Sequence, residues 1–246
     1  MFVPPKDIRG MYDKEKVQMP AGVDSWFSKT NGNVFQGIML GRYENQYRRY
    51  CEVLTAMDRQ IDRLLRKVDE MGLRDNTFLI FMADNGMLWG EHRSHGIKEP
   101  CEESIRVPMI VRAPGIIREA GSRRSQMVLN IDRAATLLDL AGVPPPEDLD
   151  GQSLLPLLRK PKTPGRDAFL LEYWKYYPEN TPSYIGVRTA THKYITYEKG
   201  LSPQLFDLIR GPAETQNLFG TPAGEKVLPA LLSKMNALSD GRKPWD

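Results

Sequence analysis

Three consecutive residues, Asp84, Asn85 and Gly86, are the part of the sequence best suited to bind an ion. They end the short apolar run of residues 77–83, which is typical of a strand buried on both faces. In open α/β sheets, ligands bind beyond the carboxyl ends of the strands. Carboxylate and amide oxygens are hard donors that suit Ca²⁺ or Mg²⁺ better than Zn²⁺. The position therefore predicts a metal half-site, while Asp-Asn-Gly is also a common turn sequence.

A polar loop that holds two of the three histidines follows this tripeptide. Residues 90–98 contain His92, His95 and Lys98, and Lys98 stands 14 positions after Asp84. A lysine over a metal site could neutralise a substrate oxyanion as a compact point charge. A histidine there could donate a proton to a leaving group. The alternative is a solvated polar loop, since lysine is mostly exposed in proteins.

The elements that position these residues follow one another as helix, strand, loop, strand and helix. Apolar residues recur every three or four positions over residues 43–68, which predicts a long amphipathic helix that ends at Gly72. Residues 107–111 form a second apolar run, and residues 131–141 have the spacing of a further helix. This order predicts an α/β fold with a mostly parallel sheet. The irregular first 40 residues indicate that the chain begins within a domain, because a long structureless segment is uncommon in a compact fold.

A stretch rich in proline, glycine and charge, residues 143–166, divides this part of the chain from a smaller one. We place a boundary there, which gives residues 1–145 as part of a large α/β domain and residues 146–246 as a small α+β subdomain. The smaller part contains four β-like runs, and their spacing predicts a small antiparallel sheet. These runs are residues 168–174, 184–189, 193–197 and 204–208. A final helix near residues 227–238 would pack on this sheet, bent or started by Pro229.

Composition excludes several classes of protein. The 246 residues are 41% hydrophobic and 26% charged with a net charge of +3, which is too apolar and too balanced for a disordered chain. The near-neutral charge gives no support to nucleic-acid binding, so we expect none. No run of about 18 apolar residues could span a membrane, and the first residues lack the apolar core of a signal peptide.

Three further residues are predicted to be structural. Cys51 and Cys101 allow at most one disulfide, and each is expected to be a small packed side chain. The third histidine, His192, lies at a turn beside Lys193 and is expected to be a surface residue.

Short motifs within residues 83–115 together resemble the second half of a sulfatase of the alkaline-phosphatase superfamily. They are Ala-Asp-Asn-Gly at 83–86, Gly-Glu-His at 90–92, Lys98, Glu-Glu-Ser-Ile-Arg-Val-Pro-Met-Ile-Val at 102–111 and Pro-Gly at 114–115. Further segments that resemble the family are residues 56–65, 150–158, 186–189 and 205–208. The resemblance covers nearly the whole chain. It implies a partial alkaline-phosphatase-like α/β sheet with flanking helices, followed by a small antiparallel sheet with a packed helix.

The resemblance also implies roles for individual residues. Asp84 and Asn85 match two ligands of the family's single Ca²⁺, and Lys98 matches the lysine that contacts the sulfate oxygens. His92 matches a frequent loop histidine whose role varies. Glu102 and Arg106 match a structural stretch, for which we expect an ion pair that braces the loop.

Two parts of the family's active site are not found in the sequence. The nucleophile of the family is a formylglycine made from Cys or Ser in the motif Cys/Ser-x-Pro-x-Arg, and Cys101 lacks that context. The paired N-terminal aspartates that complete the metal site are also missing, and two oxygen donors do not satisfy a cation that takes six to eight. The chain therefore resembles the C-terminal half to two-thirds of a sulfatase and is expected to be inactive alone. The missing N-terminal half would be supplied in cis or in trans, with formylglycine in that part.

In complete members of the family, a hydroxyl of the hydrated formylglycine attacks the sulfur, Ca²⁺ and the lysine hold the sulfate oxygens, and a histidine protonates the leaving alcohol. The aromatic residues within 173–177, together with Tyr184, could stack on sugar rings or form a packed strand edge. Asp84, Asn85 and Gly86 together with the stretch at Glu172 and Tyr173 resemble carbohydrate sulfatases, including those acting on N-acetylglucosamine-6-sulfate. We expect a sulfated glycan or small molecule as substrate. The alternatives are a phosphonate or phosphate monoester hydrolase of the same superfamily and a non-catalytic, degenerate sulfatase module. Complete members are often exported, periplasmic or lysosomal.

Overall fold

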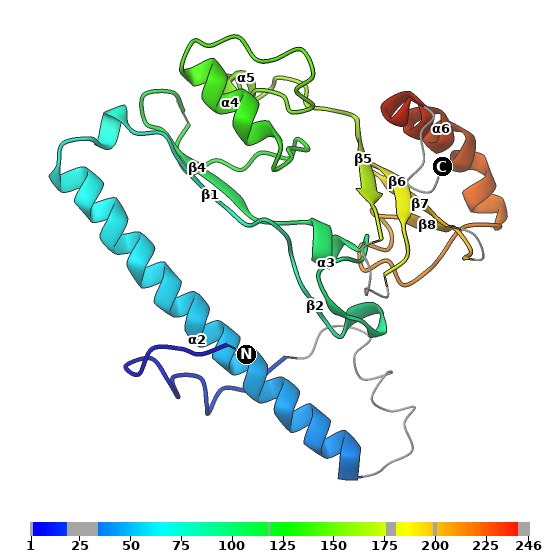
Figure 1. The fold of residues 1–246 in the computed structure, drawn as a ribbon, viewed down its shortest axis with the longest axis horizontal. Coiled ribbons are helices and arrows are strands. Elements are labelled where there is room, and N and C mark those ends of the chain that lie inside the picture. The colour runs from blue at the N-terminus through cyan, green and yellow to red at the C-terminus, as the bar shows by residue number, and fades with distance from the viewer. Residues whose placement is uncertain (1, 19–33, 118, 176–180, 199–200, 241–246) are drawn as a thin grey trace. The chain divides into compact units, whose positions relative to one another are not determined.

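The computed structural model describes residues 2–18, 34–117, 119–175, 181–198 and 201–240 (Figure 1). The chain divides into two compact units. The first unit comprises Met1–Leu79, Trp89–His95 and Arg112–Gly115, and the second comprises Ile80–Leu88, Gly96–Val111 and Ile116–Asp246. Among the described helices, none combines the length and the apolar character that crossing a bilayer requires.

The first unit is built on one long helix, α2 (Val34–Glu70), which is followed by the 3₁₀ turn η1 (Arg74–Asn76). The predicted helix is confirmed, but it begins at Val34 rather than near Gly41. Glycine provides the reversal at its end, since Gly72 has a φ of +69°. The helix is amphipathic, but three apolar residues of its predicted buried stripe are exposed: Leu54, Met57 and Leu64.

The buried side of α2 packs on aromatic rings. Trp89 is 6% exposed, and the ring centroids of Tyr47 and Tyr50 each lie 5.1 Å from its own. Phe2 and Tyr43 complete the cluster at 5.9 and 5.8 Å. Aromatic pairs at these separations contribute energy beyond their buried area, so the tyrosines at positions 43, 47 and 50, spaced by four and three residues, fix the face that α2 presents.

The remaining elements before residue 160 are short. Strands β1 (Leu79–Met82) and β4 (Met109–Arg112) form one two-stranded sheet, and β2 (Leu88–Trp89) and β3 (His95–Gly96) form another. The helical elements in this region are η2 (Glu91–Arg93), α3 (Glu102–Ile105), α4 (Asp132–Leu140) and α5 (Leu155–Arg159). Both predicted apolar strands and the predicted helix at 131–141 are therefore present.

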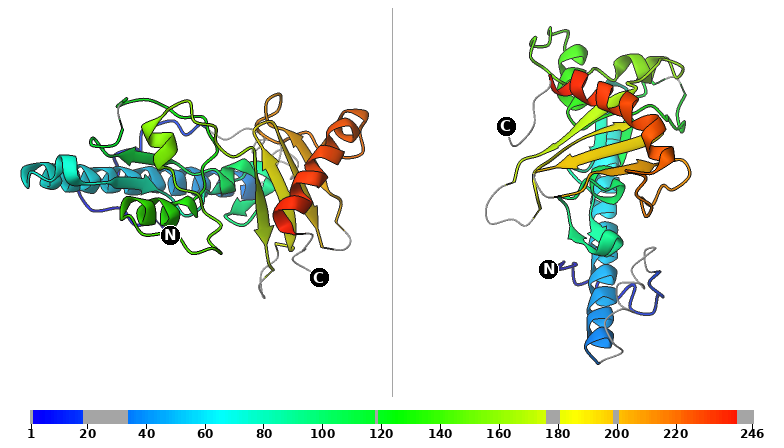
Figure 2. Two further views of the ribbon diagram at one scale, coloured as in Figure 1. Left: turned by 90° about the horizontal axis from the view of Figure 1, so that it is seen from above. Right: turned by 90° about the vertical axis from the view of Figure 1, so that its right-hand side faces the viewer.

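The end of the chain forms a four-stranded antiparallel sheet with the order β5-β6-β7-β8. Its strands are β5 (Ala168–Tyr173), β6 (Tyr184–Thr189), β7 (His192–Tyr197) and β8 (Gln204–Asp207). The helix α6 (Pro222–Ser239) lies across one face (Figure 2), where its Leu231 and Met235 pack on Ile185, Val187 and Leu205. The α/β fold class and the small antiparallel sheet with a packed helix are confirmed.

The start of α6 differs from the prediction. The helix begins at Pro222, and the side chain of Thr221 accepts a hydrogen bond from the Gly224 N–H. Threonine at the N-cap followed by proline at the first helical position is a strong start signal. Pro229 lies inside the helix rather than at its beginning.

A buried carboxylate joins the segments around α4 and α5. Asp132 is fully buried, and both of its oxygens bind the Arg166 guanidinium, at 2.6 and 2.7 Å. The same oxygens accept the N–H groups of Leu129 at 2.7 Å and Gln152 at 2.9 Å. Burial opposes ionisation of Asp132, but these donors outweigh it, so the pKa of Asp132 is lowered. The Asp132 carboxylate thus links segments of the chain that lie up to 34 positions apart in the sequence.

Candidate active site

Asp84 and Asn85 follow β1 after one further residue, Ala83, as the sequence predicts for a site at the end of a strand. The Asn85 N–H donates to Asp84 Oδ1 at 2.9 Å, and Asn85 Nδ2 donates to the Gly86 carbonyl at 2.8 Å. The second bond turns the amide nitrogen toward the backbone, so the amide oxygen is the atom that can face a cation. Asp84 is exposed and Asn85 is half-buried. This pair has the donor chemistry of a Ca²⁺ or Mg²⁺ half-site.

Gly86 holds this turn against α3. Its N–H donates to the Ser104 carbonyl at 2.7 Å, and a Cβ at position 86 would lie 2.0 Å from the carbonyl oxygen of Glu103. Only a residue without a side chain allows two backbones to approach so closely. Gly86 is therefore required by the contact with α3.

Gly86→Ala is expected to displace the turn from α3, because backbone atoms on both sides cannot yield as a flexible side chain would. We expect a loss of unfolding free energy of about 1–3 kcal/mol, measured by urea denaturation. Gly211→Ala is the control, because a Cβ at position 211 would meet only the Asp207 carbonyl oxygen, at an ordinary contact distance of 3.6 Å. Equal losses in the two variants would show that the close approach at Gly86 is unimportant.

The segment that carries Lys98 is held by the same residue of α3. The Ser104 hydroxyl donates to the carbonyl of Ile97 at 2.7 Å, and Ser104 is 2% exposed. One buried serine thus binds Gly86 through its carbonyl and Ile97 through its hydroxyl. The residues next to these two contacts are Asn85 and Lys98, so α3 brings the segment of Asp84 and Asn85 and the segment of Lys98 together. Lys98 itself is half-buried.

His92 belongs to the other unit, within the segment Trp89–His95. It lies in η2, is exposed, and has a left-handed backbone with a φ of 54°. The turn is held by two bonds of Glu91, whose carboxylate accepts the Trp89 N–H at 2.5 Å and whose carbonyl accepts the Ser94 N–H at 2.9 Å. The structure therefore shows a specific loop conformation at His92, and its role in chemistry stays a prediction.

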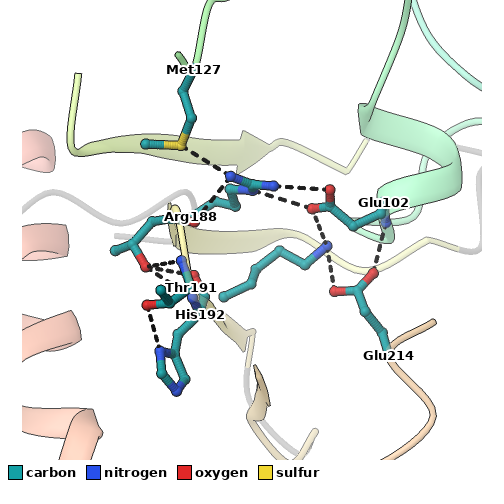
Figure 3. Close-up of polar contacts among 8 residues, drawn as sticks. Glu102, Met127, Arg188, Thr191, His192 and Glu214 are labelled. Atoms are coloured by element: carbon teal, nitrogen blue, oxygen red, sulfur yellow. Dashed lines mark hydrogen bonds and ion pairs between the residues drawn. The ribbon is translucent and has the colours of Figure 1, made fainter. Parts of the chain in front are cut away.

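Four charged residues meet where α3 contacts the C-terminal sheet (Figure 3). Glu102 binds Arg188 with closest distances of 3.2 and 3.4 Å, and it binds Lys193 at 3.3 Å. Lys193 also contacts Glu214 Oε1 at 2.5 Å, and the second oxygen of Glu214 accepts the Glu102 N–H at 2.7 Å. We call these residues, Glu102, Arg188, Lys193 and Glu214, the charged tetrad. The expected ion pair between Glu102 and Arg106 was wrong, because Glu102 turns to the sheet while Arg106 is exposed.

Burial acts on both carboxylates of the tetrad, and the net effect on the pKa differs between them. Lys193 is fully buried and Glu214 is 4% exposed. Burial raises the pKa of Glu214, and the nearby Lys193 only partly opposes this. Burial also acts on Glu102, but its bonds to Arg188 and Lys193 outweigh it, so the pKa of Glu102 is lowered. Sequence reasoning missed this group, since its local signal is a single lysine beside Tyr194 and Ile195 in a predicted strand.

The aromatic residues proposed for sugar stacking are divided between packing and exposure. Tyr184 is buried, with its ring centroid 5.5 Å from that of Tyr173 and 6.1 Å from that of Tyr197. Trp174, the next residue after β5, is 60% exposed. Tyr176 and Tyr177 lie outside the described residues. Tyr184 is thus part of the packed edge of the sheet, and stacking of the exposed Trp174 on sugar rings stays a prediction.

The two cysteines are not bonded to each other, and the third histidine lies at the start of a strand. Cys51 and Cys101 are both free thiols and half-buried, so they do not form the one disulfide that the sequence allowed. His192 starts β7, is half-buried, and its Nδ1 lies 2.9 Å from the Thr191 hydroxyl.

Two family models match the chain. One, described as Sulfatase, matches residues 7–143, and the other, described as N-sulphoglucosamine sulphohydrolase, C-terminal, matches residues 90–241. An N-acetylglucosamine-6-O-sulfatase of Bacteroides thetaiotaomicron is 35% identical over 190 residues, which are 75% of this chain and 34% of the relative.

Solved structures show the same relationship. A protein in complex with its substrate D-glucosamine-2-N,6-O-disulfate matches with a TM-score of 0.79 at 29% identity, over 89% of this chain and 44% of that one. The phosphonate monoester hydrolase of Agrobacterium radiobacter matches with a TM-score of 0.72 at 25% identity, over 80% of this chain and 42% of that one. The chain thus spans about a third of the curated relative and less than half of each solved structure. Because family models match more than half of its residues, the chain belongs to the sulfatase family.

Proposed function

We propose that this chain is the part of a sulfatase that supplies half of the metal site and the anion-binding lysine for hydrolysis of carbohydrate sulfate esters. The observation that carries the proposal is the double contact of Ser104, with Gly86 at 2.7 Å and with Ile97 at 2.7 Å. It supports a common pocket for the neighbouring residues Asp84, Asn85 and Lys98.

Each of these side chains has a task in that pocket. The Lys98 ammonium donates hydrogen bonds to the non-bridging sulfate oxygens, where charge redistributes as the ester bond breaks. Asp84 and Asn85 supply one carboxylate and one amide oxygen, which fit Ca²⁺ and do not fit a metal that requires thiolate or imidazole. A bound Ca²⁺ supplies positive charge beside the sulfate. His92 is the candidate to donate a proton to the leaving alcohol.

The remaining parts of the site would come from a further, N-terminal half, in cis or in trans. A divalent cation such as Ca²⁺ takes six to eight oxygen donors, so the pair Asp84 and Asn85 needs partners from that half. The formylglycine nucleophile of the family would also lie there. We expect this chain by itself to bind Ca²⁺ only weakly, with a dissociation constant on the order of 10⁻³ M or higher. We also expect it not to hydrolyse sulfate esters by itself.

A carbohydrate sulfate is the proposed substrate class. The support is the exposed indole of Trp174 beside the last strand residue of β5, since aromatic faces stack well on sugar rings. Two relatives point the same way by their names, because one is an N-acetylglucosamine-6-O-sulfatase and another was solved with a glucosamine disulfate.

A phosphonate or phosphate monoester hydrolase is the second candidate, favoured by the structural match to such an enzyme. A sulfate ester and a phosphonate or phosphate ester would both bind the same lysine and the same metal. Competition between sulfate and methylphosphonate for the chain separates the two, because a sulfatase site is expected to bind sulfate more tightly. A non-catalytic module would bind neither anion at Lys98.

The proposal is tested on the 246-residue chain by nuclear magnetic resonance. Mn²⁺ is expected to broaden the amide signals of Asp84, Asn85 and Gly86 first, and Asp84→Ala should remove this selectivity. The matched control is Asp148→Ala, which removes an exposed carboxylate of the same unit. Sulfate should shift the Lys98 signals in the chain and in a Lys162→Met control, but not after Lys98→Met. Broadening that is unchanged by Asp84→Ala would overturn the metal half-site.

A further inference from the structure

We propose that the charged tetrad is a positioning network: it fixes α3 and thereby sets the placement of Lys98 relative to Asp84 and Asn85. This inference rests on the proposed function, because it assigns a cause to the geometry of the same oxyanion site. None of the four residues is proposed to touch the substrate.

The tetrad binds α3 to the sheet at three points. The Glu102 carboxylate receives Arg188 from β6 and Lys193 from β7, and the Glu102 N–H donates to Glu214 in the segment after β8. The Lys193 ammonium links the carboxylates of Glu102 and Glu214, which Figure 3 labels, at 3.3 Å from Glu102 Oε1 and 2.5 Å from Glu214 Oε1. A four-residue helix has too few internal hydrogen bonds to hold its own position, so these contacts determine where it lies.

The path from the tetrad to the site is short. Ser104 is two residues after Glu102 in the same helix, and its carbonyl and hydroxyl hold Gly86 and Ile97. A shift of α3 would therefore move the turn of Asp84 and Asn85 and the segment of Lys98 together with Ser104. A displacement of about 1 Å is enough to impair a catalytic constellation severely.

The charges of the tetrad explain why the arrangement is specific. Two carboxylates and two cations sum to zero, which is the condition under which buried charges are tolerated. Glu214 is held with a left-handed backbone, φ 48°, which costs energy for a residue other than glycine. The surrounding contacts fix its carboxylate between Lys193 and the Glu102 N–H, and so support a role in defining one position of α3.

The experiment compares two isosteric changes, Glu102→Gln in the tetrad and Asp132→Asn in the other buried carboxylate site of the same unit. Amide hydrogen exchange of the 246-residue chain is the first measurement. Glu102→Gln is expected to raise the exchange rate of the Gly86 N–H about tenfold, with little change at the Gln152 N–H. Asp132→Asn is expected to do the reverse, since Gln152 donates to Asp132.

The second measurement is the sulfate affinity with and without saturating Ca²⁺, read from the Lys98 signals. In the unmodified chain we expect Ca²⁺ to tighten sulfate binding about tenfold. Glu102→Gln should abolish the tightening of sulfate binding by Ca²⁺. Asp132→Asn should retain it, even where the two variants lower the melting temperature by the same amount. If Glu102→Gln does not fold, the charge-balanced double variant Lys193→Met with Glu214→Gln serves in its place.

The outcomes separate the two proposals. Unchanged exchange at Gly86, or raised exchange with an intact Ca²⁺ enhancement, would overturn the positioning role and leave the proposed function standing. Absence of sulfate and metal binding in the unmodified chain would overturn the proposed function, and the positioning role with it. Equal effects of Asp132→Asn on the Ca²⁺ enhancement would also overturn the positioning role, because they would reduce it to general stability.

Discussion

Lys98→Ala is expected to lower kcat/KM for a carbohydrate sulfate about 10²–10³-fold, the usual cost of removing one preorganised donor to a developing oxyanion. The assay uses a chimera in which these 246 residues replace the matching part of the N-acetylglucosamine-6-O-sulfatase of Bacteroides thetaiotaomicron. The loss should fall mainly on kcat, because the lysine is proposed to act on charge that develops in the transition state.

Two comparisons make this result specific. Lys162→Ala, which removes an exposed lysine of the same unit, is expected to leave both kinetic constants unchanged. Lys98→Arg should recover only part of the activity, since a guanidinium is a planar fork and not a compact point charge. An increase in KM with kcat intact would mean that Lys98 contributes uniform binding, against its proposed role.

Asp132→Ala is expected to have the largest effect on stability. It would leave the Arg166 guanidinium buried without its carboxylate and remove the acceptor of the Leu129 and Gln152 N–H groups. Breaking a buried ion pair in this way typically costs about 3–5 kcal/mol. Urea unfolding followed by circular dichroism measures the loss. Asp139→Ala on the same helix α4 is the control, because Asp139 is exposed, and it should cost no more than about 1 kcal/mol.

The stabilisation by Asp132 should depend on pH in one direction. Its pKa is lowered in the folded chain, so the ionised form binds better in the native state than in the unfolded one. The contribution is complete above the unfolded pKa of about 3.9 and disappears as pH falls through the lower native value. Glu214 acts oppositely, since its raised pKa means that stability is lost as pH rises through that native value. The difference in melting temperature between the chain and Asp132→Asn should therefore shrink below about pH 4; a difference that is constant with pH would contradict the ion-pair account.

Local patterns account for most of the predicted elements. The spacing of Tyr43, Tyr47 and Tyr50 predicted the face of α2 that packs on Trp89, because neighbours three and four positions apart share one side of a helix. The apolar runs ending at Ala83 and at Val111 predicted strands, and β1 and β4 are found there. The sequence predicted the ends of elements less well than the elements themselves. The helix α6 starts at Thr221 and Pro222, whereas Pro229, which was predicted to bend or start the helix, lies within it.

The sequence by itself determined which residues could do chemistry: an acid and an amide after a strand, a lysine fourteen positions later, and motifs in the order of the sulfatase family. It did so because these features are local, and a short motif carries its own turn and donor chemistry. Only the tertiary structure decided which contacts hold the segments of these residues in place. Glu102 binds partners 86 and 91 positions away and donates to Glu214 112 positions away, and Ser104 faces Gly86 across the fold. Buried charges need partners, but nothing in the neighbouring residues specifies which distant segment provides them, because that choice is made when the sheet and α3 pack together.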